Sequence, residues 1–399
     1  MVRNFEDEWE FTDDLKDPDW SRYAVYAPRV REVTDYDPSP NDQVSNDALR
    51  SILAHLPSHL QLLRPAFLHF FSTSGASTAS LLLQLPLISQ SLRRLRLVGP
   101  RSLSDQPPAG FTSALWEASR LPQPCLEAFE VVCRAGDKDF IEAINTCLIK
   151  HGSRIARLSI RPPFNGQLWA SVISLPALQA LDIAPLQDGE LGRLKEVLPM
   201  IRALVAGQPQ LKCFELHLSL RGEPSQSYSS YFGIIRDLMG LRNLETLKLK
   251  ISLPLSLTEP QVEEMGVSWP SMRILELDTA SIYGARIERE DRASQNSLSL
   301  LPYFLRSLPR LKELRVPFTY DEPLAAPQEE RRGSALRTLD LKLCPEPNSH
   351  ASPEQVVAYL AAVLPHTARI GSLYYSGSRR VFWSKVAEGL SDLREAAKP

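Results

Sequence analysis

The sequence predicts an α/β solenoid, a fold in which short strands and helices alternate and stack into one array. Three observations support this fold class. A pattern of the form apolar-x-x-apolar-x-apolar recurs along the chain at intervals of 23 to 39 residues. Segments with helical periodicity lie between several copies. The chain has 399 residues and 32 prolines, which is typical of many short elements rather than of one compact core.

The apolar pattern occurs ten times, and its spacing explains the geometry of each copy. The first apolar residue closes a corner of the chain, and the next two point inward from a short strand with period two. A neighbouring copy covers those side chains, so the repeat is stable only as an array. We therefore predict an irregular leucine-rich-repeat solenoid (horseshoe) with a concave parallel sheet, convex helices and a short N-terminal cap segment. The first positions are Leu92, Leu126, Ile155, Leu178, Leu211, Leu244, Met272, Leu311, Leu336 and Ile370.

Helices are predicted between the copies. The segment 352–364 begins with Ser352 as an N-cap, Pro353 in the first turn and Gln355 at the capping-box position. The segments 140–150 and 301–308 each place apolar side chains on one face. Residues 284–297 and 321–334 are expected to be surface inserts.

The domain organisation follows from these patterns. Residues 1–19 are predicted to be an acidic, disordered arm, and residues 20–45 an N-terminal cap segment. The solenoid itself covers residues 46–378, and residues 379–399 form a C-terminal capping helix. Trp20, Tyr23 and Tyr26 have a spacing of three, which predicts a short helix that covers the first strand. A direct partner site at these aromatic residues is the alternative.

Composition and charge exclude several classes of function. The net charge of -2 provides no general attraction to nucleic acid or to an anionic membrane. The most apolar window, residues 81–88, is too short to span a bilayer. The 5 cysteines are odd in number and scattered, so we expect free thiols and an intracellular location, in the cytoplasm or the nucleus. A monomer is expected.

Catalytic and cofactor motifs are missing from the sequence. It contains neither a G-x-S-x-G nucleophile elbow nor a glycine-rich phosphate loop. His55 and His59 have the spacing of a helical zinc pair, but Pro57 lies between them. The adjacent carboxylates Glu263 and Glu264 fit a solvated helix better than acid–base catalysis. We expect no enzyme activity, no metal and no cofactor.

The scattered cysteines and a basic strand are two further candidate sites. Cys125, Cys133 and Cys147 lack C-x-x-C spacing, so buried apolar roles are expected. The arginines at 93, 94 and 96 form the most basic strand and could bind phosphate. A nucleic-acid surface needs a continuous basic stripe with aromatic residues, and that continuity is lacking.

A partner would bind on the concave face, where the side chain between the last two apolar positions of each copy points. Those residues are Arg96, Glu130, Ser159, Asp182, Glu215, Lys248, Glu276, Arg315, Asp340 and Tyr374. All but Ser159 are our candidate partner-binding residues. Because five are acidic and three basic, we predict a protein or peptide partner with basic residues opposite Asp182, Glu215 and Glu276. The alternative is that these polar residues only keep an exposed sheet face soluble.

The segment at residues 18–33, P-D-W-S-R-Y-A-V-Y-A-P-R-V-R-E-V, carries a resemblance to a family. It resembles the motif W-x-R-[FY]-x-x-Y-A-x-R-[VI]-R-x-[LV], which follows the F-box in F-box and leucine-rich-repeat proteins of mushroom-forming fungi. The resemblance implies a substrate receptor whose F-box binds the Skp-type adaptor of a ubiquitin ligase. The F-box itself is expected to be missing from this chain, because only 19 residues precede Trp20, and they form an acidic segment without a helical apolar stripe. Loss of the module and its omission from the gene model both stay open.

Two functions remain in competition. The first is a non-enzymatic protein-recognition solenoid that acts as an F-box-like substrate receptor for ubiquitin-dependent protein turnover. The second is a stand-alone leucine-rich-repeat scaffold or inhibitor with no link to ubiquitin. A Skp-type adaptor is expected as a partner only where an F-box lies upstream.

Overall fold

A computed structural model describes sixteen segments of the chain. These are residues 2–3, 9–10, 32–35, 67–71, 93–98, 111–120, 126–132, 138–161, 166–184, 194–218, 231–251, 255–278, 296–319, 334–341, 352–371 and 378–396. The aromatic segment around Trp20, the histidine pair at 55 and 59, and the first corner residue Leu92 lie outside them.

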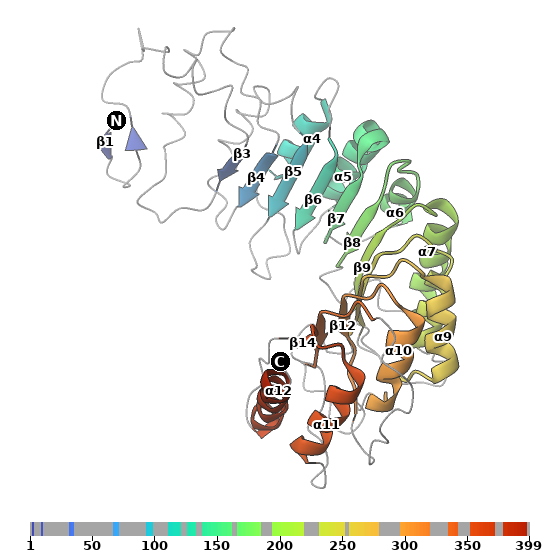
Figure 1. The fold of residues 1–399 in the computed structure, drawn as a ribbon. Coiled ribbons are helices and arrows are strands. Elements are labelled where there is room, and N and C mark those ends of the chain that lie inside the picture. The colour runs from blue at the N-terminus through green and yellow to red at the C-terminus, as the bar shows by residue number, and fades with distance from the viewer. Residues whose placement is uncertain are drawn as a thin grey trace. The chain divides into compact units, whose positions relative to one another are not determined.

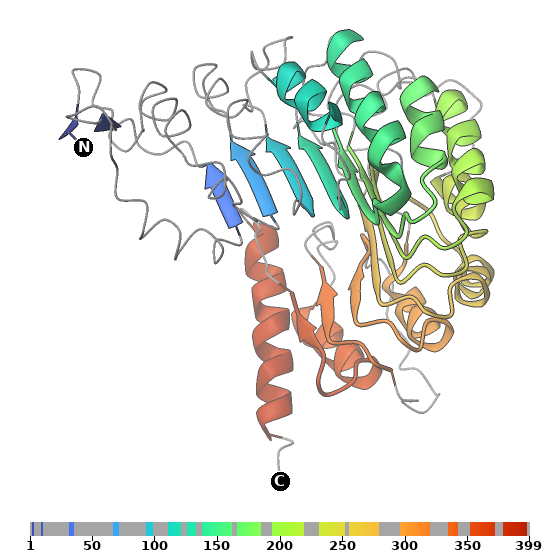
Figure 2. The ribbon, with the colours of Figure 1, turned by 90° about the horizontal axis from the view of Figure 1, so that it is seen from above.

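The chain divides into two compact units, Met1–Glu190 and Leu191–Pro399. In unit 1 the strands β3 to β8 pair in parallel in chain order, and a short antiparallel pair, β1 and β2, precedes them. The helices of this unit pack on one face of its strands (Figures 1 and 2). Its elements are β1 Val2–Arg3, β2 Trp9–Glu10, β3 Glu32–Asp35, β4 Phe67–Phe71, β5 Arg94–Val98, α4 Phe111–Arg120, β6 Ala128–Val132, α5 Lys138–His151, η4 Gly152–Arg154, β7 Arg157–Ile160, α6 Gly166–Ile173 and β8 Ala180–Ile183.

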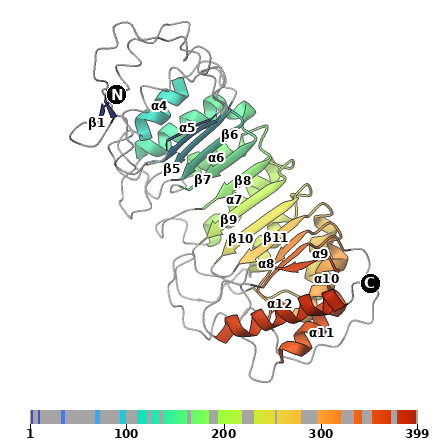
Figure 3. The same ribbon diagram turned by 60° about the vertical axis from the view of Figure 1, so that its left-hand side comes forward.

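Unit 2 repeats the same alternation of strands and helices. Its strands β9 to β14 pair in parallel, each with the next one along the chain. Figure 3 shows β9, β10 and β11 side by side. Its elements are α7 Leu194–Gly207, β9 Cys213–Leu218, α8 Tyr231–Leu238, β10 Thr246–Ile251, α9 Glu259–Ser268, β11 Ile274–Asp278, η5 Leu298–Leu300, α10 Leu301–Ser307, β12 Glu313–Arg315, β13 Thr338–Asp340, α11 Pro353–Val363, β14 Arg369–Ile370 and α12 Ser378–Ala396.

The predicted α/β leucine-rich-repeat fold class is confirmed by the register of the strands. In β10, Leu247 pairs with Phe214 on one side and with Leu275 on the other, and all three occupy the second apolar position of their copies. The same agreement holds from Leu95 to Leu181 in unit 1 and from Phe214 to Leu339 in unit 2. The corner residues from Leu126 to Leu336 are at most 4% exposed. The apolar triads therefore form the core, as their spacing predicts.

At the last copy, the observed register differs from the predicted one. Ile370 pairs with Leu339, so it occupies the second apolar position and not the first. The strand residue that follows is Gly371, whose N–H donates to the carbonyl of Leu339 at 2.8 Å. The predicted register is displaced by three residues at this copy, and Tyr374 lies outside the described residues. The corner position is therefore Thr367, a polar and exposed residue that the apolar pattern does not match, and Ala368 after it is buried.

The strands β1 and β2 lie in the segment 1–19 that is predicted to be a disordered arm, and they pair with each other. Two strands of the parallel array were also missed by the pattern. β3 falls within the predicted cap segment, and β4 precedes the first predicted copy, yet they pair with each other and β4 pairs with β5. In register, Asp35 stands at the third apolar position of β3, and in the sequence the residue three before Leu68 is Pro65, which does not match the apolar pattern. A search that requires three apolar residues fails at both.

Helix starts agree with the capping signals in the sequence. The predicted helix at 352–364 is α11, and the Ser352 hydroxyl accepts a hydrogen bond from the N–H of Gln355 at 3.2 Å. The predicted helices at 140–150 and 301–308 are α5 and α10. The Tyr231 hydroxyl on α8 donates to the carbonyl of Leu249 at 2.9 Å, which ties α8 to β10. Burial of this hydroxyl raises the pKa of Tyr231 well above its usual value.

Asn296 corrects the prediction of a surface insert at 284–297. Its side chain is fully buried, accepts from the N–H of Leu257 at 2.7 Å and donates to the carbonyl of Pro317 at 3.1 Å. An amide that satisfies two backbone groups of distant segments is a structural tie. The end of this insert thus belongs to the core.

Backbone carbonyls at the corners link one copy to the next. The carbonyl of Lys212 accepts from the N–H groups of Glu245 and Thr246 at 2.7 and 3.0 Å. The residues Glu245, Arg273 and Lys312 play the same part at the following junctions. At the end of the array the Ala368 carbonyl accepts from the Arg394 guanidinium of α12. α12 packs on α11 in the segment where the capping helix is predicted (Figure 3).

We expect Gly266→Ala to destabilise unit 2. A Cβ at Gly266 in α9 would lie 2.6 Å from Cβ of Ser307 in α10 and 2.9 Å from its backbone carbonyl carbon. Because backbone cannot yield as a side chain does, the free energy of unfolding should fall by about 1–3 kcal/mol. Urea denaturation followed by circular dichroism measures this.

Gly166→Ala is the matched control, since nothing lies within 4 Å of its Cβ position at the start of α6. This variant should be unchanged or up to about 1 kcal/mol more stable. Equal destabilisation by both substitutions would contradict the close packing of α9 on α10.

Candidate recognition surface

Five charged side chains form a row across the strands of unit 2, which we call the charge ladder. Its members are the predicted concave-face residues of β9 to β13, and each is in register with the next. Their signs alternate from strand to strand. The ladder consists of Glu215, Lys248, Glu276, Arg315 and Asp340.

Ion pairs connect most neighbours in the ladder. Nζ of Lys248 lies 3.3 Å from Oε2 of Glu215, and Nη1 of Arg315 lies 2.9 Å from Oε1 of Glu276. Nε of Arg315 also lies 3.7 Å from Oδ2 of Asp340. Opposite charges on adjacent strands stabilise a sheet, whereas like charges would destabilise it. The alternation therefore suits parallel strands in this register.

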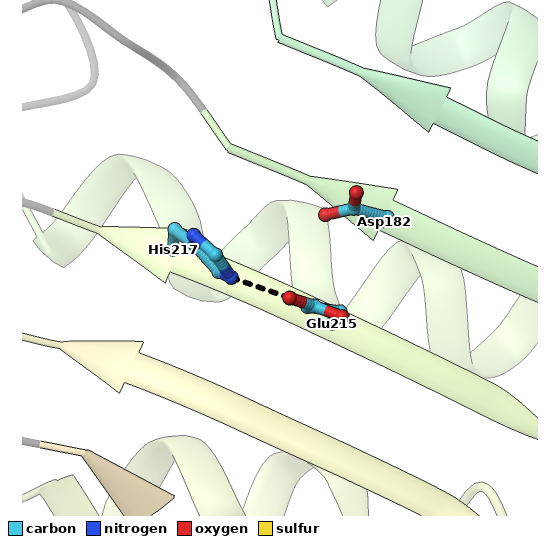
Figure 4. Close-up of side chains that lie close together, drawn as sticks. All are labelled: Asp182, Glu215 and His217. Atoms are coloured by element: carbon cyan, nitrogen blue, oxygen red, sulfur yellow. Dashed lines mark hydrogen bonds and ion pairs between the residues drawn. The ribbon is translucent and has the colours of Figure 1, made fainter. Parts of the chain in front are cut away.

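A second, shorter row lies two residues further along β9 to β11. His217, Lys250 and Asp278 are in register there. Nζ of Lys250 lies 3.8 Å from Glu215 and 3.7 Å from Glu276, so it joins the two rows. Nε2 of His217 donates to Oε1 of Glu215 at 2.7 Å, as Figure 4 shows.

Glu215 is the electrostatic centre of this surface. The hydrogen bond from His217 and the nearby Lys248 and Lys250 ammonium groups lower the pKa of its carboxyl from 4.5 to about 2, against an opposing effect of burial. The side chain is 24% exposed. It is thus an ionised carboxylate, held in place by its neighbours, that solvent and a partner can still reach.

The strand face of unit 1 carries a related arrangement. Nε of Arg96 lies 2.9 Å from Oε1 of Glu130, and the Ser159 hydroxyl donates to Oδ2 of Asp182 at 2.8 Å. Nη2 of Arg161 lies 3.5 Å from the same Asp182 oxygen. Burial raises the pKa of Glu130, although Arg96 opposes this. The predicted residues of this unit are therefore also paired within the chain.

The structure describes eight of the nine predicted partner-binding residues, all on strands, and Tyr374 is the ninth. Within each unit, the structure brings these residues together in the ion pairs and hydrogen bonds described above. Sequence reasoning missed His217, Lys250, Asp278 and Arg161. Each of them lies two residues beyond a predicted concave-face residue, because the alternation of inward and outward side chains continues past the third apolar position. Continuing the alternation in "LKLKI" would have found Lys250.

Other residues that the sequence offered as catalytic or metal-binding candidates make contacts that hold the fold together. Glu263 pairs with Arg306 at 2.7 Å and Glu264 with Arg236 at 3.2 Å, which links α9 to α10 and to α8. Cys147 is a free, buried thiol whose Sγ donates to the carbonyl of Leu115 at 3.1 Å. Burial raises the pKa of this thiol to about 12, so it stays protonated.

Among the described residues, every helix is too short or too polar to cross a lipid bilayer.

Comparisons with known proteins identify no family for this chain. No family model matches the sequence, and no curated protein matches it. Among solved structures, a chain of the Rad7 and Elc1 complex from yeast is similar. The match covers 85% of this chain and 67% of that chain, with 15% sequence identity and a TM-score of 0.44.

We expect Glu215→Gln to lower stability in a pH-dependent way. Because the pKa of Glu215 is depressed in the folded chain, its ionised form stabilises the fold above its usual pKa of 4.5. The loss at pH 7 should be about 2 kcal/mol, less than the full displacement of the pKa implies, since the side chain is partly exposed. The difference from the wild type should shrink between pH about 4.5 and about 2, where Glu215 becomes protonated.

Urea denaturation of both chains at pH 7, 4.5 and 3 tests this expectation. Glu264→Gln, at an exposed pair on the outer helices, should change the free energy by less than about 0.5 kcal/mol. A Glu215→Gln effect of the same size at pH 7 and pH 3 would show that the carboxylate charge is not the cause.

Proposed function

We propose that this chain is a non-enzymatic recognition protein that holds a protein or peptide on its strand face. The observation that carries the proposal is the charge ladder, which places partly exposed charges in fixed positions on a sheet whose other face is leucine core. Ordered charges in register supply specificity for a partner. The same order also stabilises the pairing of the strands, so the face serves the fold as well as a partner.

The cellular role that we propose is that of an F-box-like substrate receptor in ubiquitin-dependent protein turnover. This finer proposal is supported by the resemblance of residues 18–33 to the segment that follows the F-box in the fungal family. Adaptor binding would need an F-box upstream of this segment. The free thiols of Cys147 and Cys213 support a setting inside the cell, in the cytoplasm or the nucleus.

A stand-alone scaffold or inhibitor is the second candidate. The charge ladder lies wholly on β9 to β13 and uses no residue of the segment 18–33, which carries the resemblance to the fungal family. Recognition on this face therefore does not require a link to ubiquitin.

Photo-crosslinking in the native organism tests where the partner binds. A benzoylphenylalanine replaces Thr246, which faces outward from β10 beside the ladder, or Val267, which is 86% exposed on α9. We expect a protein crosslinked specifically at 246 and not at 267. The reverse result would contradict recognition on the strand face. Deletion of the gene should then lengthen the half-life of the captured protein if the chain is a substrate receptor, and leave it unchanged if the chain is a scaffold.

Charge reversal tests the predicted contacts. Asp182→Lys, Glu215→Lys and Glu276→Lys should each weaken binding of the crosslinked partner at least tenfold at low salt, because each removes an attractive charge and adds a repulsive one. Affinity for the wild type should also fall with added salt. Glu263→Lys on the outer helices is the control and should leave the dissociation constant within about twofold. Unchanged binding of all three strand-face variants would refute the proposed contacts.

A further inference from the structure

We propose that the segment bound on the charge ladder is an amphipathic α-helix that lies across the strands and carries charges of alternating sign, about one per turn. The proposal rests on the proposed function and specifies the partner more closely. The partner's cations would lie over Glu215, Glu276 and Asp340, and its anions over Lys248 and Arg315.

The spacing of the strands favours a helix over an extended chain. Neighbouring strands lie about 4.8 Å apart, so the five ladder positions span about 19 Å. A helix offers one side chain on the same face about every 5.4 Å, and an extended chain about every 6.7 Å. Over four steps the helix drifts from the ladder by about 2.4 Å and the extended chain by about 7.6 Å. Long charged side chains can absorb the first displacement, whereas the second exceeds a whole strand spacing.

The internal ion pairs of the ladder favour alternating partner charges. A purely basic helix would place cations over Lys248 and Arg315 as well as over the carboxylates. At about 5 Å, each like-charge contact weakens binding by about fivefold to a hundredfold, for an effective dielectric constant between that of water and that of a protein surface. Together the two rows hold four carboxylates against three cations besides His217, so little excess negative charge remains to offset this cost.

The ladder is ordered, and all of its members except the largely buried Glu276 are clearly reachable from solvent. Exposed fractions of its side chains are 24% for Glu215, 33% for Lys248 and 12% for Glu276. Arg315 and Asp340 are 22% and 23% exposed. Because ion pairs already hold these groups in place, binding costs less side-chain entropy than it would at free surface charges.

An uncharged row beside the ladder supplies the place for the apolar stripe of the helix. Cys213, Thr246 and Ile274 are in register two residues before Glu215, Lys248 and Glu276, and all three are half-buried. On β12 the same row continues with the exposed Glu313, so the uncharged strip is limited to β9, β10 and β11. A helix with apolar residues on the flank next to its charges would therefore cover this uncharged strip and the charged strip at once.

Three designed 18-residue helical peptides, stapled on the far face and sharing one apolar flank, test the proposal. The first carries Lys-Glu-Lys-Glu-Lys at one charge per turn, the second has the same residues in the order Lys-Lys-Lys-Glu-Glu, and the third has five lysines. We expect the full chain to bind the alternating peptide at least tenfold more tightly than the other two in fluorescence anisotropy at low salt. Equal affinities, or tightest binding of the all-lysine peptide, would overturn the proposal.

Variants of the chain test whether the ladder reads the signs. Lys248→Gln combined with Arg315→Gln should abolish the preference for the alternating peptide over the all-lysine one. Lys248→Gln alone should reduce it by about half on a logarithmic scale. Arg236→Gln combined with Arg306→Gln removes two paired arginines from the outer helices and should keep the full preference. Thermal melts confirm that each variant is folded.

Two results separate this inference from the proposed function. A proline-containing peptide with the alternating charges cannot form a helix, and its binding as tightly as the stapled form would overturn the helical partner. If none of the peptides binds while position 246 still crosslinks a native protein, the helix inference is wrong and recognition on the strand face stands. If neither occurs, both proposals fail.

Discussion

Coverage of each leucine triad by the next copy is the interaction on which the rest of this structure depends. Leu244, Leu247 and Leu249 are all fully buried, although they come from a segment of only six residues. No such segment can bury three large side chains by itself, so each copy is stable only between neighbours. This burial fixes the strands in a common register, with equivalent positions side by side.

The same register determines the outer face. When the core places Lys248 beside Glu215 and Glu276, the outward residues cannot be chosen independently, because like charges on adjacent strands would oppose the stacking. The ladder is therefore both a product of the core and a constraint on it. The charges of this surface are nearly balanced, so a partner of the kind proposed above would gain affinity only where its own charges follow the same order.

Much of the fold could be predicted because its main signal is local and repeated. Three apolar residues within six positions mark a strand wherever they occur, and nine of ten predicted copies agree with the observed register. The signal fails where a polar residue takes an apolar place, as Asp35 does in β3 and Thr367 does at the last corner. The buried role of Asn296 depends on backbone groups 21 and 39 residues away, which no local pattern records.

The candidate surface could be predicted in position but not in chemistry. Outward-facing residues follow from alternation alone, whereas their ion pairs depend on which strands become neighbours and how far each strand extends. Lys250 joins the two rows only because β9, β10 and β11 continue beyond the third apolar position. A count of acidic and basic residues therefore suggested a negative face, and the contacts between them describe a nearly balanced one.

The contact of Arg394 with the Ala368 carbonyl bears on how such an array can change in length during evolution. At the junctions from β5 to β8 and from β9 to β14, the equivalent carbonyl receives one or two backbone N–H groups of the following copy, and here a guanidinium takes their place. A duplicated strand–helix unit added after this point would have to displace Arg394 from its acceptor, while one inserted between two existing copies would pair with the donors and acceptors that they now offer to each other. Growth of the array by internal duplication thus keeps the contact of Arg394, and growth by extension breaks it.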